Sequence, residues 1–314
     1  MYAVTIIDGR LEWTEHPEPV PGAGEVLIRV RAAGLNGADR MQVAGLYPAP
    51  PGVPADIPGM ELAGEVVASG PGANWFQPGD RVMAVVGGGG QAEMAVVHER
   101  HLLAVPDALG WEEAGGFPEV FTTAHDALFT QCRLEVGERV CVHGAAGGVG
   151  IAGVQLAVAA GAEVVATVRS DDLRGAVADF GATAIAPDTF VEHGPFDVVL
   201  ELIGAPNLAD DVRSLATGGR VVVIGVGGGA KAELNLLDLM GRRGRIHAST
   251  LRPRSLEEKA GAARRVEHHV LPLVTSGKVR VPVAASFPMA AAVAAYERFA
   301  AGGKLGKVVL TNDA

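Results

Sequence analysis

The length, composition and charge of the chain narrow its class before any motif is considered. It has 314 residues, of which 48% are hydrophobic, and a formal net charge of −10. This length suits two domains with buried cores, while the acidic balance disfavours nucleic acid or an anionic membrane surface as the main partner. With no charged and apolar leader and no apolar run near the ~18 residues of a membrane helix, we expect a cytoplasmic protein.

The first third of the chain predicts a β-rich domain. Short apolar or alternating runs, separated by turn signals, are typical of strands. They cover residues 25–31, 61–69, 81–86 and 91–97. Prolines crowd the stretch 48–58, which predicts an irregular loop.

From about Pro118 the pattern changes to alternating helix and strand, which predicts a doubly wound parallel sheet. The expected strands lie near Val140, Val164, Val198, Val221 and Ile246. A helical segment over 255–276, a helix over 289–299 and a strand over 305–310 follow. We therefore expect a β-rich domain from 1–118 and 255–314, and a dinucleotide-binding domain from 119–254.

The strand around Val140 leads into a glycine-rich turn and then a helix. Gly144, Gly147 and Gly150 recur every third residue, so the backbone turns sharply and exposes N–H groups to a pyrophosphate. This spacing differs from G-x-G-x-x-G, and a tight turn that binds nothing is the alternative. The residues expected to contact a dinucleotide are Gly144, Ala146, Gly147, Gly148, Val149 and Gly150.

The end of the next strand bears on which dinucleotide is bound. An acidic residue there favours NAD, but this strand is followed by Arg169 and Ser170, with Arg174 one turn later. These groups favour a 2′-phosphate and hence NADPH. Asp171 and Asp172 weaken this preference, and we interpret them as first-turn carboxylates that follow an N-cap at Ser170.

Two cysteines, Cys132 and Cys141, have no companions with metal-ligand spacing. We expect both to be reduced and structural, with Cys141 buried in a strand and Cys132 partly exposed at a helix end.

The order of these parts resembles the zinc-free quinone oxidoreductases of the medium-chain dehydrogenase/reductase superfamily. The resemblance covers essentially the whole chain. The segments that carry it are Gly34–Asp39, Gly45–Pro48, Pro58–Val66, Gly79–Val82, Gly89–Ala92, Pro118–Leu128, His143–Gly150 and Gly303–Leu310. It implies a Rossmann domain, a GroES-like catalytic domain and a homodimer, with the edge strand near 245–250 as a candidate contact.

The zinc enzymes of this superfamily bind their catalytic metal with a Cys, a His and a third ligand. Asn36, Met60 and Glu119 occupy the matching positions here. An amide and a thioether are poor zinc ligands, so we expect no catalytic metal. Without a Lewis acid the substrate must itself be electrophilic, as quinones and conjugated enones are.

The resemblance also implies catalytic positions. Asn36 would donate to a substrate oxygen, while Asp39 would orient neighbours or cap a short helix over 40–44. Tyr47 offers a phenol and a ring for stacking, or closes a turn. Thr123 would lie near the nicotinamide, with a helix N-cap as the alternative.

On the cofactor side, the turn Gly225–Gly229 would line the nicotinamide. Arg252 and Lys304 would reach the cofactor, although solvated charges are the alternative for both. His125 and His143 are interpreted as structural.

We therefore predict NADPH-dependent reduction of a quinone without a metal. One alternative is NADPH-dependent reduction of the C=C bond of an enone or enoyl thioester. A further alternative is an NADPH-binding sensor or structural protein.

Overall fold

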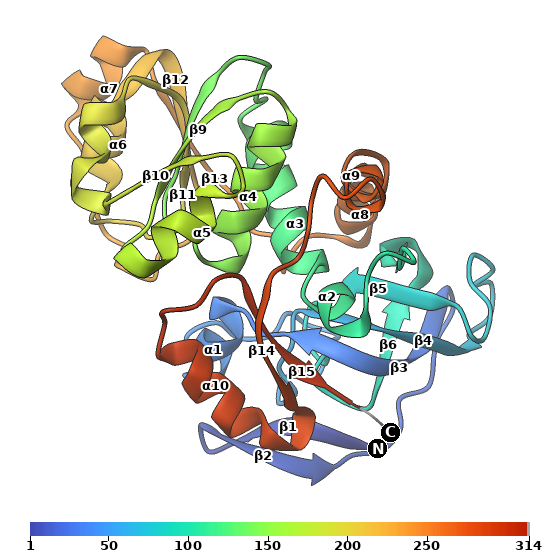
Figure 1. Ribbon diagram of the computed structural model, residues 1–314. Coiled ribbons are helices and arrows are strands. Elements are labelled where there is room, and N and C mark those ends of the chain that lie inside the picture. The colour runs from blue at the N-terminus through green and yellow to red at the C-terminus, as the bar shows by residue number, and fades with distance from the viewer. Residues whose placement is uncertain (313–314) are drawn as a thin grey trace. The chain divides into compact units, whose positions relative to one another are not determined.

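The computed structural model describes residues 1–312 and separates them into two units, each with its own core (Figure 1). Unit 1 comprises Met1–Thr122, Leu251–Gly302 and the chain from Lys307 on, and unit 2 comprises Thr123–Thr250 and Gly303–Gly306. The boundaries differ from the predicted 118 and 255 by a few residues. Gly303–Gly306, predicted as part of the β-rich domain, group with unit 2, where Gly306 pairs with the glycine-rich turn.

Unit 1 is built on a mostly antiparallel seven-stranded sheet, as expected for a GroES-like domain. In sheet order its strands are β14 (Val283–Pro288), β15 (Lys307–Thr311), β3 (Glu25–Gly34), β4 (Glu61–Ser69), β5 (Arg81–Val85) and β7 (Leu103–Ala104), and β6 (Met94–His98) pairs with β3. A separate ribbon of β1 (Tyr2–Ile7) and β2 (Arg10–Glu15) was not predicted.

The longest described helix of unit 1 is α8 (Leu256–His269), which together with the short helix α9 (Leu271–Thr275) covers the segment predicted over 255–276. The other helical elements are α1 (Gly37–Val43), η1 (Glu99–His101), α2 (Trp111–Gly115), η5 (Met289–Ala291) and α10 (Ala292–Ala300), while α3 (Pro118–His125) crosses into unit 2. Ser255 accepts from the Glu258 amide and starts α8. Pro272 lies in the first turn of α9, where a proline is tolerated, and the helix breaks before it.

Unit 2 contains the predicted parallel sheet. Its strand order is β10 (Thr183–Ile185), β9 (Glu163–Thr167), β8 (Arg139–Val142), β11 (Phe196–Glu201), β12 (Leu215–Val223) and β13 (Arg245–Ala248). The interior strands are buried, and helices lie on both sides of the sheet (Figure 1). The helical elements are η2 (Asp126–Gln131), α4 (Gly148–Ala159), η3 (Asp171–Leu173), α5 (Arg174–Ala178), η4 (Pro187–His193), α6 (Leu208–Arg213) and α7 (Leu236–Arg242).

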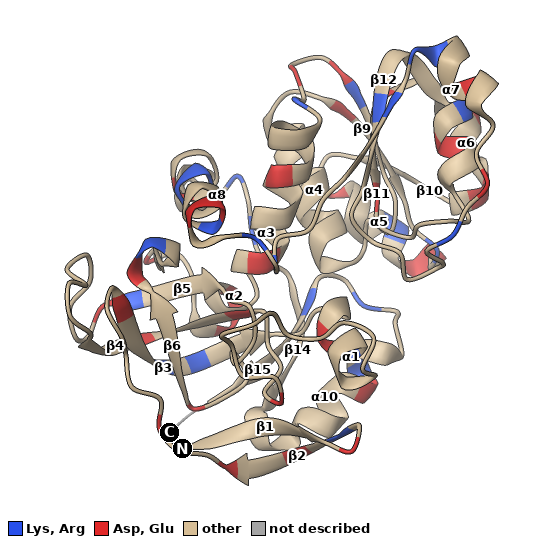
Figure 2. Cartoon of the chain, turned by 180° about the vertical axis from the view of Figure 1, so that it is seen from behind, with Lys and Arg blue, Asp and Glu red and all other residues tan. Residues whose placement is uncertain are grey.

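The burial of the two cysteines and the character of the helices can also be compared with the predictions. Cys141 is buried as predicted, but Cys132 is only 3% exposed, so its predicted partial exposure is wrong. Cys132 directly follows the π-helical turn η2, which ends at Gln131. Among the described residues no helix has both the length and the apolarity to cross a bilayer, and Lys and Arg lie interspersed with Asp and Glu (Figure 2).

Candidate active site

A buried lysine organises the polar interior of unit 1. Lys307 opens β15, and its ammonium donates to Glu61 Oε1 at 2.7 Å, Asn36 Oδ1 at 2.7 Å and the Leu35 carbonyl at 2.8 Å. Lys307 is 3% exposed and Glu61 is fully buried. All three protons of the ammonium are therefore used. We call Asn36, Glu61 and Lys307 the lysine cluster.

The lysine cluster also fixes the Asn36 amide. Its Nδ2 donates to Glu61 Oε1 at 2.9 Å and to the Gly34 carbonyl at 3.4 Å. Both hydrogen bonds lie within unit 1, whereas the predicted role of Asn36 is donation to a substrate oxygen. In the structure Asn36 contacts both the lysine and the glutamate.

Asp39 is the third residue of α1, whose N-cap is Asn36. Its carboxylate accepts from the Asn36 backbone at 2.8 Å, which caps α1, and from the Gly59 backbone at 3.2 Å, which ties down the proline-rich loop. Burial raises the pKa of Asp39 to about 6, although these hydrogen bonds and Lys307 oppose the rise.

The residues at the expected zinc position do not fit a zinc ion. Asn36 and Met60 provide an amide and a thioether, and Glu119 lies beside Glu61, whose Oε2 accepts from the Glu119 backbone at 2.9 Å. The nearest carboxylate already faces the Lys307 ammonium, so a second cation would meet a positive charge.

Arg252 is buried within unit 1. It is 1% exposed, and it donates to the Gly87 carbonyl at 2.7 Å, the Tyr47 carbonyl at 2.9 Å and Gln42 Oε1 at 2.5 Å. Its guanidinium also lies 5.0 Å from the centre of the Tyr47 ring. Arg252 thus ties together α1, the turn at Tyr47 and the glycine turn at Gly87, whereas the sequence predicts that it contacts the cofactor.

The glycine-rich turn of unit 2, Gly144–Gly150, is here called the glycine loop. Gly144 has a φ of +61°, and a Cβ on Gly150 would lie 2.5 Å from the Gly144 carbonyl oxygen. Because α4 starts at Gly148, the first-turn amides of Gly148, Val149 and Gly150 have no intrahelical acceptor. The turn leaves a backbone surface suited to a phosphate.

The chain's tail completes this loop. Gly306 donates its backbone N–H to the Ala146 carbonyl at 2.9 Å, and Gly147 and Gly306 form a parallel bridge. Lys304 lies in the same short segment and donates to the Gly306 carbonyl at 3.3 Å. The structure therefore places Lys304 near the glycine loop.

The residues predicted to select NADPH lie just beyond the carboxyl end of β9. Arg169 is exposed, and Ser170 precedes η3 but makes no side-chain cap. Arg174 donates to the Val168 carbonyl at 3.2 Å and pairs with Asp171 at 2.6 Å. Asp171 thus faces Arg174, and Arg169 presents its charge to solvent.

The turns after β11 and β12 pack backbone against backbone. A Cβ on Gly225 would lie 2.2 Å from the Leu202 carbonyl oxygen, and Gly204 and Gly229 form a bridge. Such glycine turns at the carboxyl ends of parallel strands are where doubly wound folds bind ligands.

Thr123 and His125 are buried within α3. Since α3 begins at Pro118, the alternative that Thr123 is an N-cap is wrong.

Sequence reasoning missed Lys307 and Glu61 as site residues, although a lysine at the start of an apolar strand is an unusual pattern.

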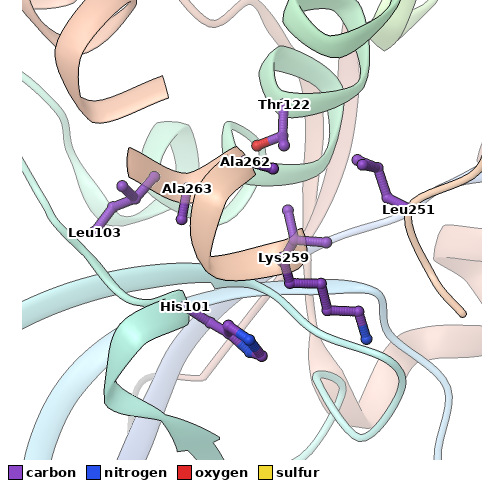
Figure 3. Close-up of a pocket in the computed structure, with 8 residues that line it drawn as sticks. His101, Leu103, Thr122, Leu251, Lys259, Ala262 and Ala263 are labelled. Atoms are coloured by element: carbon purple, nitrogen blue, oxygen red, sulfur yellow. The ribbon is translucent and has the colours of Figure 1, made fainter. Parts of the chain in front are cut away.

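A pocket lies beneath α8 in unit 1, with about 340 Å³ of empty space that includes open solvent. Figure 3 shows its lining, which comprises Val85, His101, Leu103, Thr122, Leu251, Lys259, Ala262 and Ala263. Burial lowers the pKa of both Lys259 and His101. None of the predicted catalytic residues is among the described residues that line it.

Comparisons with known proteins agree with this architecture. Residues 22–132 match the alcohol dehydrogenase GroES-like domain, and residues 160–310 match the zinc-binding dehydrogenase family. A quinone oxidoreductase of Rattus norvegicus is 31% identical over 93% of this chain and 90% of its own length.

Two further relatives differ in what their names describe. An acryloyl-coenzyme A reductase of Metallosphaera sedula is 31% identical over 96% of each chain. A mycobacterial protein solved in complex with NADPH has a TM-score of 0.87 at 26% identity, and the similarity covers 99% of this chain and 100% of that one. The similarity in each case extends over both units.

Proposed function

We propose that this chain, which belongs to the medium-chain dehydrogenase/reductase superfamily of oxidoreductases, reduces quinones with NADPH and without a metal. The observation that carries the proposal is the glycine loop, in which a side chain at Gly150 would meet the Gly144 backbone. This surface of bare backbone fits a pyrophosphate.

The cofactor contacts follow from unit 2. The glycine loop would hold the pyrophosphate. The 2′-phosphate would be bound by Arg169, Ser170 and Arg174, and the Gly225 turn would contact the nicotinamide half of the cofactor. Lys304 would contact the cofactor from its place near the loop. When bound, NADPH would supply a hydride.

The substrate class follows from unit 1. Since the lysine cluster does not fit a zinc ion, the acceptor must be electrophilic without Lewis-acid help. We assign to the Tyr47 hydroxyl the donation of a hydrogen bond to the receiving oxygen, because Arg252 holds its ring and backbone in place. Asn36 and Asp39 position this region, and Thr123 helps to place the nicotinamide.

A second candidate function is reduction of a C=C bond conjugated to a carbonyl or thioester. It is favoured by the similarity to an acryloyl-coenzyme A reductase over nearly the whole of both chains. The same hydride donor serves both reactions, and they differ in the acceptor. A chain that binds NADPH tightly and turns over no acceptor would instead be a sensor or structural protein.

The test is an absorbance assay with NADPH and, separately, NADH against a benzoquinone, an ortho-quinone and a simple enone. We expect quinone turnover that prefers NADPH and resists a chelator. Tyr47→Phe should lower kcat by about 100-fold, as loss of a positioned donor does, while Tyr2→Phe, at an exposed position, should not change it.

Enone turnover alone would favour the second candidate. NADPH binding without any turnover would favour a sensor or structural role. Activity lost with chelator would contradict the metal-free reaction.

We also propose a homodimer formed through β13, the edge strand of the parallel sheet.

A further inference from the structure

Three buried ionisable side chains meet in unit 2 and take no part in the function proposed above. His143 follows β8, Glu201 ends β11 and Asp211 lies on α6. His143 Nε2 lies 2.9 Å from Asp211 Oδ1 and 3.9 Å from Glu201 Oε2, and all three side chains are fully buried. We call them the histidine cluster.

The histidine cluster is joined to the glycine loop. His143 directly precedes Gly144, and its Nδ1 lies 3.0 Å from Thr167 Oγ1. The Thr167 carbonyl in turn accepts the Ala145 backbone N–H at 3.1 Å. The position of the His143 ring is thus coupled to the course of the loop through one residue of β9.

The same cluster is joined to the turns that carry Gly204 and Gly225. The Glu201 carboxylate accepts from the backbone N–H groups of Ile203 and, at 2.7 Å, Gly204, and from Asn207 Nδ2 at 2.9 Å. The Glu201 carbonyl accepts the Gly225 N–H at 3.2 Å. The Glu201 side chain therefore holds the turn at Gly204, and its backbone carbonyl holds the turn at Gly225.

The negative charge of the Glu201 and Asp211 carboxylates is buried and therefore needs a nearby positive charge or a proton. In the part of the chain that the structure describes, His143 is the ion-pair partner of both carboxylates, and Asp211 Oδ2 has no hydrogen-bond partner. The other groups that face His143 are Thr167 Oγ1, the Cys141 thiol, 3.7 Å away, and the Phe190 ring, which lies perpendicular to the imidazole. None of them supplies a positive charge.

Burial makes two adjacent negative charges costly. It raises the pKa of Asp211 to about 7 and raises the pKa of Glu201, whereas it lowers the pKa of His143. Burial also raises the pKa of the Cys141 thiol, which stays neutral. The two carboxylates each offer an oxygen within 4.8 Å of the other and of the imidazole. A single proton shared among these three groups agrees with the directions of all three pKa shifts.

We propose that His143, Glu201 and Asp211 are positioning residues that hold a shared proton. They thereby fix the glycine loop and the turns at Gly204 and Gly225 in the conformation that binds NADPH. This rests on the proposed function, because it concerns binding of that cofactor. When the shared proton leaves, the cluster gains a buried negative charge beneath the loop that would hold the pyrophosphate. Affinity for NADPH should then fall as the pH rises.

The experiment compares the full-length protein with Asp211→Asn, which needs no proton to be neutral. Asp210→Asn is the matched control, because Asp210 lies beside Asp211 on α6 but pairs with Arg213 at the surface. Glu201→Gln is a second test variant in case Asp211→Asn does not fold. The Kd of NADPH and the melting temperature without cofactor are measured from pH 6 to 8.5, with metal analysis of the purified protein.

We expect the wild-type Kd to rise about tenfold across this range, as for loss of one linked proton, and Asp210→Asn to follow it. Asp211→Asn should keep a nearly constant Kd, and its melting temperature should fall less with pH than that of the wild type. Parallel pH profiles in wild type and Asp211→Asn would overturn the proposal. So would a stoichiometric divalent cation in the purified protein, since it would replace the proton.

Two further outcomes separate this inference from the proposed function. Melting profiles that diverge while the Kd profiles stay parallel would refute the positioning role and leave NADPH binding intact. If the wild type binds no NADPH at any pH, the proposed function fails and the positioning role fails with it, whereas diverging melting profiles would still identify the shared proton.

Discussion

Lys307 determines what chemistry the interior of unit 1 can support. A buried carboxylate is expensive unless a cation and hydrogen bonds compensate it, and Lys307 supplies Glu61 with the cation. The same ammonium orients Asn36. A lysine thus supplies the positive charge in this region of unit 1.

Removing this cation should destabilise unit 1. We expect Lys307→Met to lower the free energy of unfolding by about 3–5 kcal/mol, because Glu61 is left buried and unpaired. The double variant with Glu61→Gln should recover much of the loss. Denaturant unfolding measures both, with the exposed Lys278→Met as control. A Lys307→Met protein as stable as the control would contradict the pairing.

Arg169 is the residue on which cofactor preference should depend. Arg169→Ala should raise the KM for NADPH about tenfold, as expected for a lost charge-assisted contact, and leave the KM for NADH nearly unchanged. Steady-state assays with both cofactors test this. Arg10→Ala removes an exposed positive charge from unit 1 and should change neither value. Equal effects of Arg169→Ala on both cofactors would defeat the assignment.

The sequence identified the positions of Asn36 and Asp39 but not their partners. Lys307 lies 271 residues from Asn36 along the chain, and no local pattern relates the two. Arg252 illustrates the same limit, since its acceptors on Gly87 and Gln42 come from distant segments. Local spacing therefore predicts where a polar residue lies in a motif, while its contacts depend on tertiary packing.

Secondary-structure elements were predictable where their pattern is strong. The strand Glu61–Ser69 has its predicted bounds, and the parallel sheet follows from buried apolar strands alternating with helices. The β1–β2 ribbon was missed, although polar and apolar residues alternate over the first four residues of β2. The helical segment over 255–276 divides at Val270, between α8 and α9, which the periodicity alone does not reveal.

The edge of the parallel sheet allows a prediction about assembly. β13 pairs with β12 alone among the described strands, Ile246 is 36% exposed, and Met240 on α7 is 69% exposed. Light scattering should give the wild type twice the chain mass of 32.2 kDa. The double variant Met240→Lys/Ile246→Lys should be monomeric, because charge on an edge strand opposes pairing.

The control for assembly is Val136→Lys, at an apolar position that is 84% exposed elsewhere in unit 2. It should remain dimeric. A double variant that keeps the mass of the wild type would show that this edge is not the contact.

At the scale of the whole molecule, two separate cores predict separate responses to pH. Burial raises the pKa of Asp39 in unit 1 to about 6 and that of Asp211 in unit 2 to about 7. Each folded unit thus retains a proton that the unfolded chain has released above pH 4. Stability should fall as the pH rises from 4 toward each raised pKa, and the loss is complete above it.

Calorimetry from pH 4 to 8 measures this effect. Asp39→Asn should reduce the pH dependence of one transition and Asp211→Asn that of the other, by several degrees in Tm. If both variants altered the same transition equally, the two units would not unfold independently.

Gly306 and Lys307 have a consequence for how the protein matures. Gly306 pairs with the glycine loop and Lys307 joins the lysine cluster, so two neighbouring residues contribute to two separate arrangements. During translation, all the other residues of both arrangements leave the ribosome before these two do. A nascent chain therefore cannot assemble either arrangement until Gly306 and Lys307 have emerged, and a protein truncated before Gly306 would lack a residue of each.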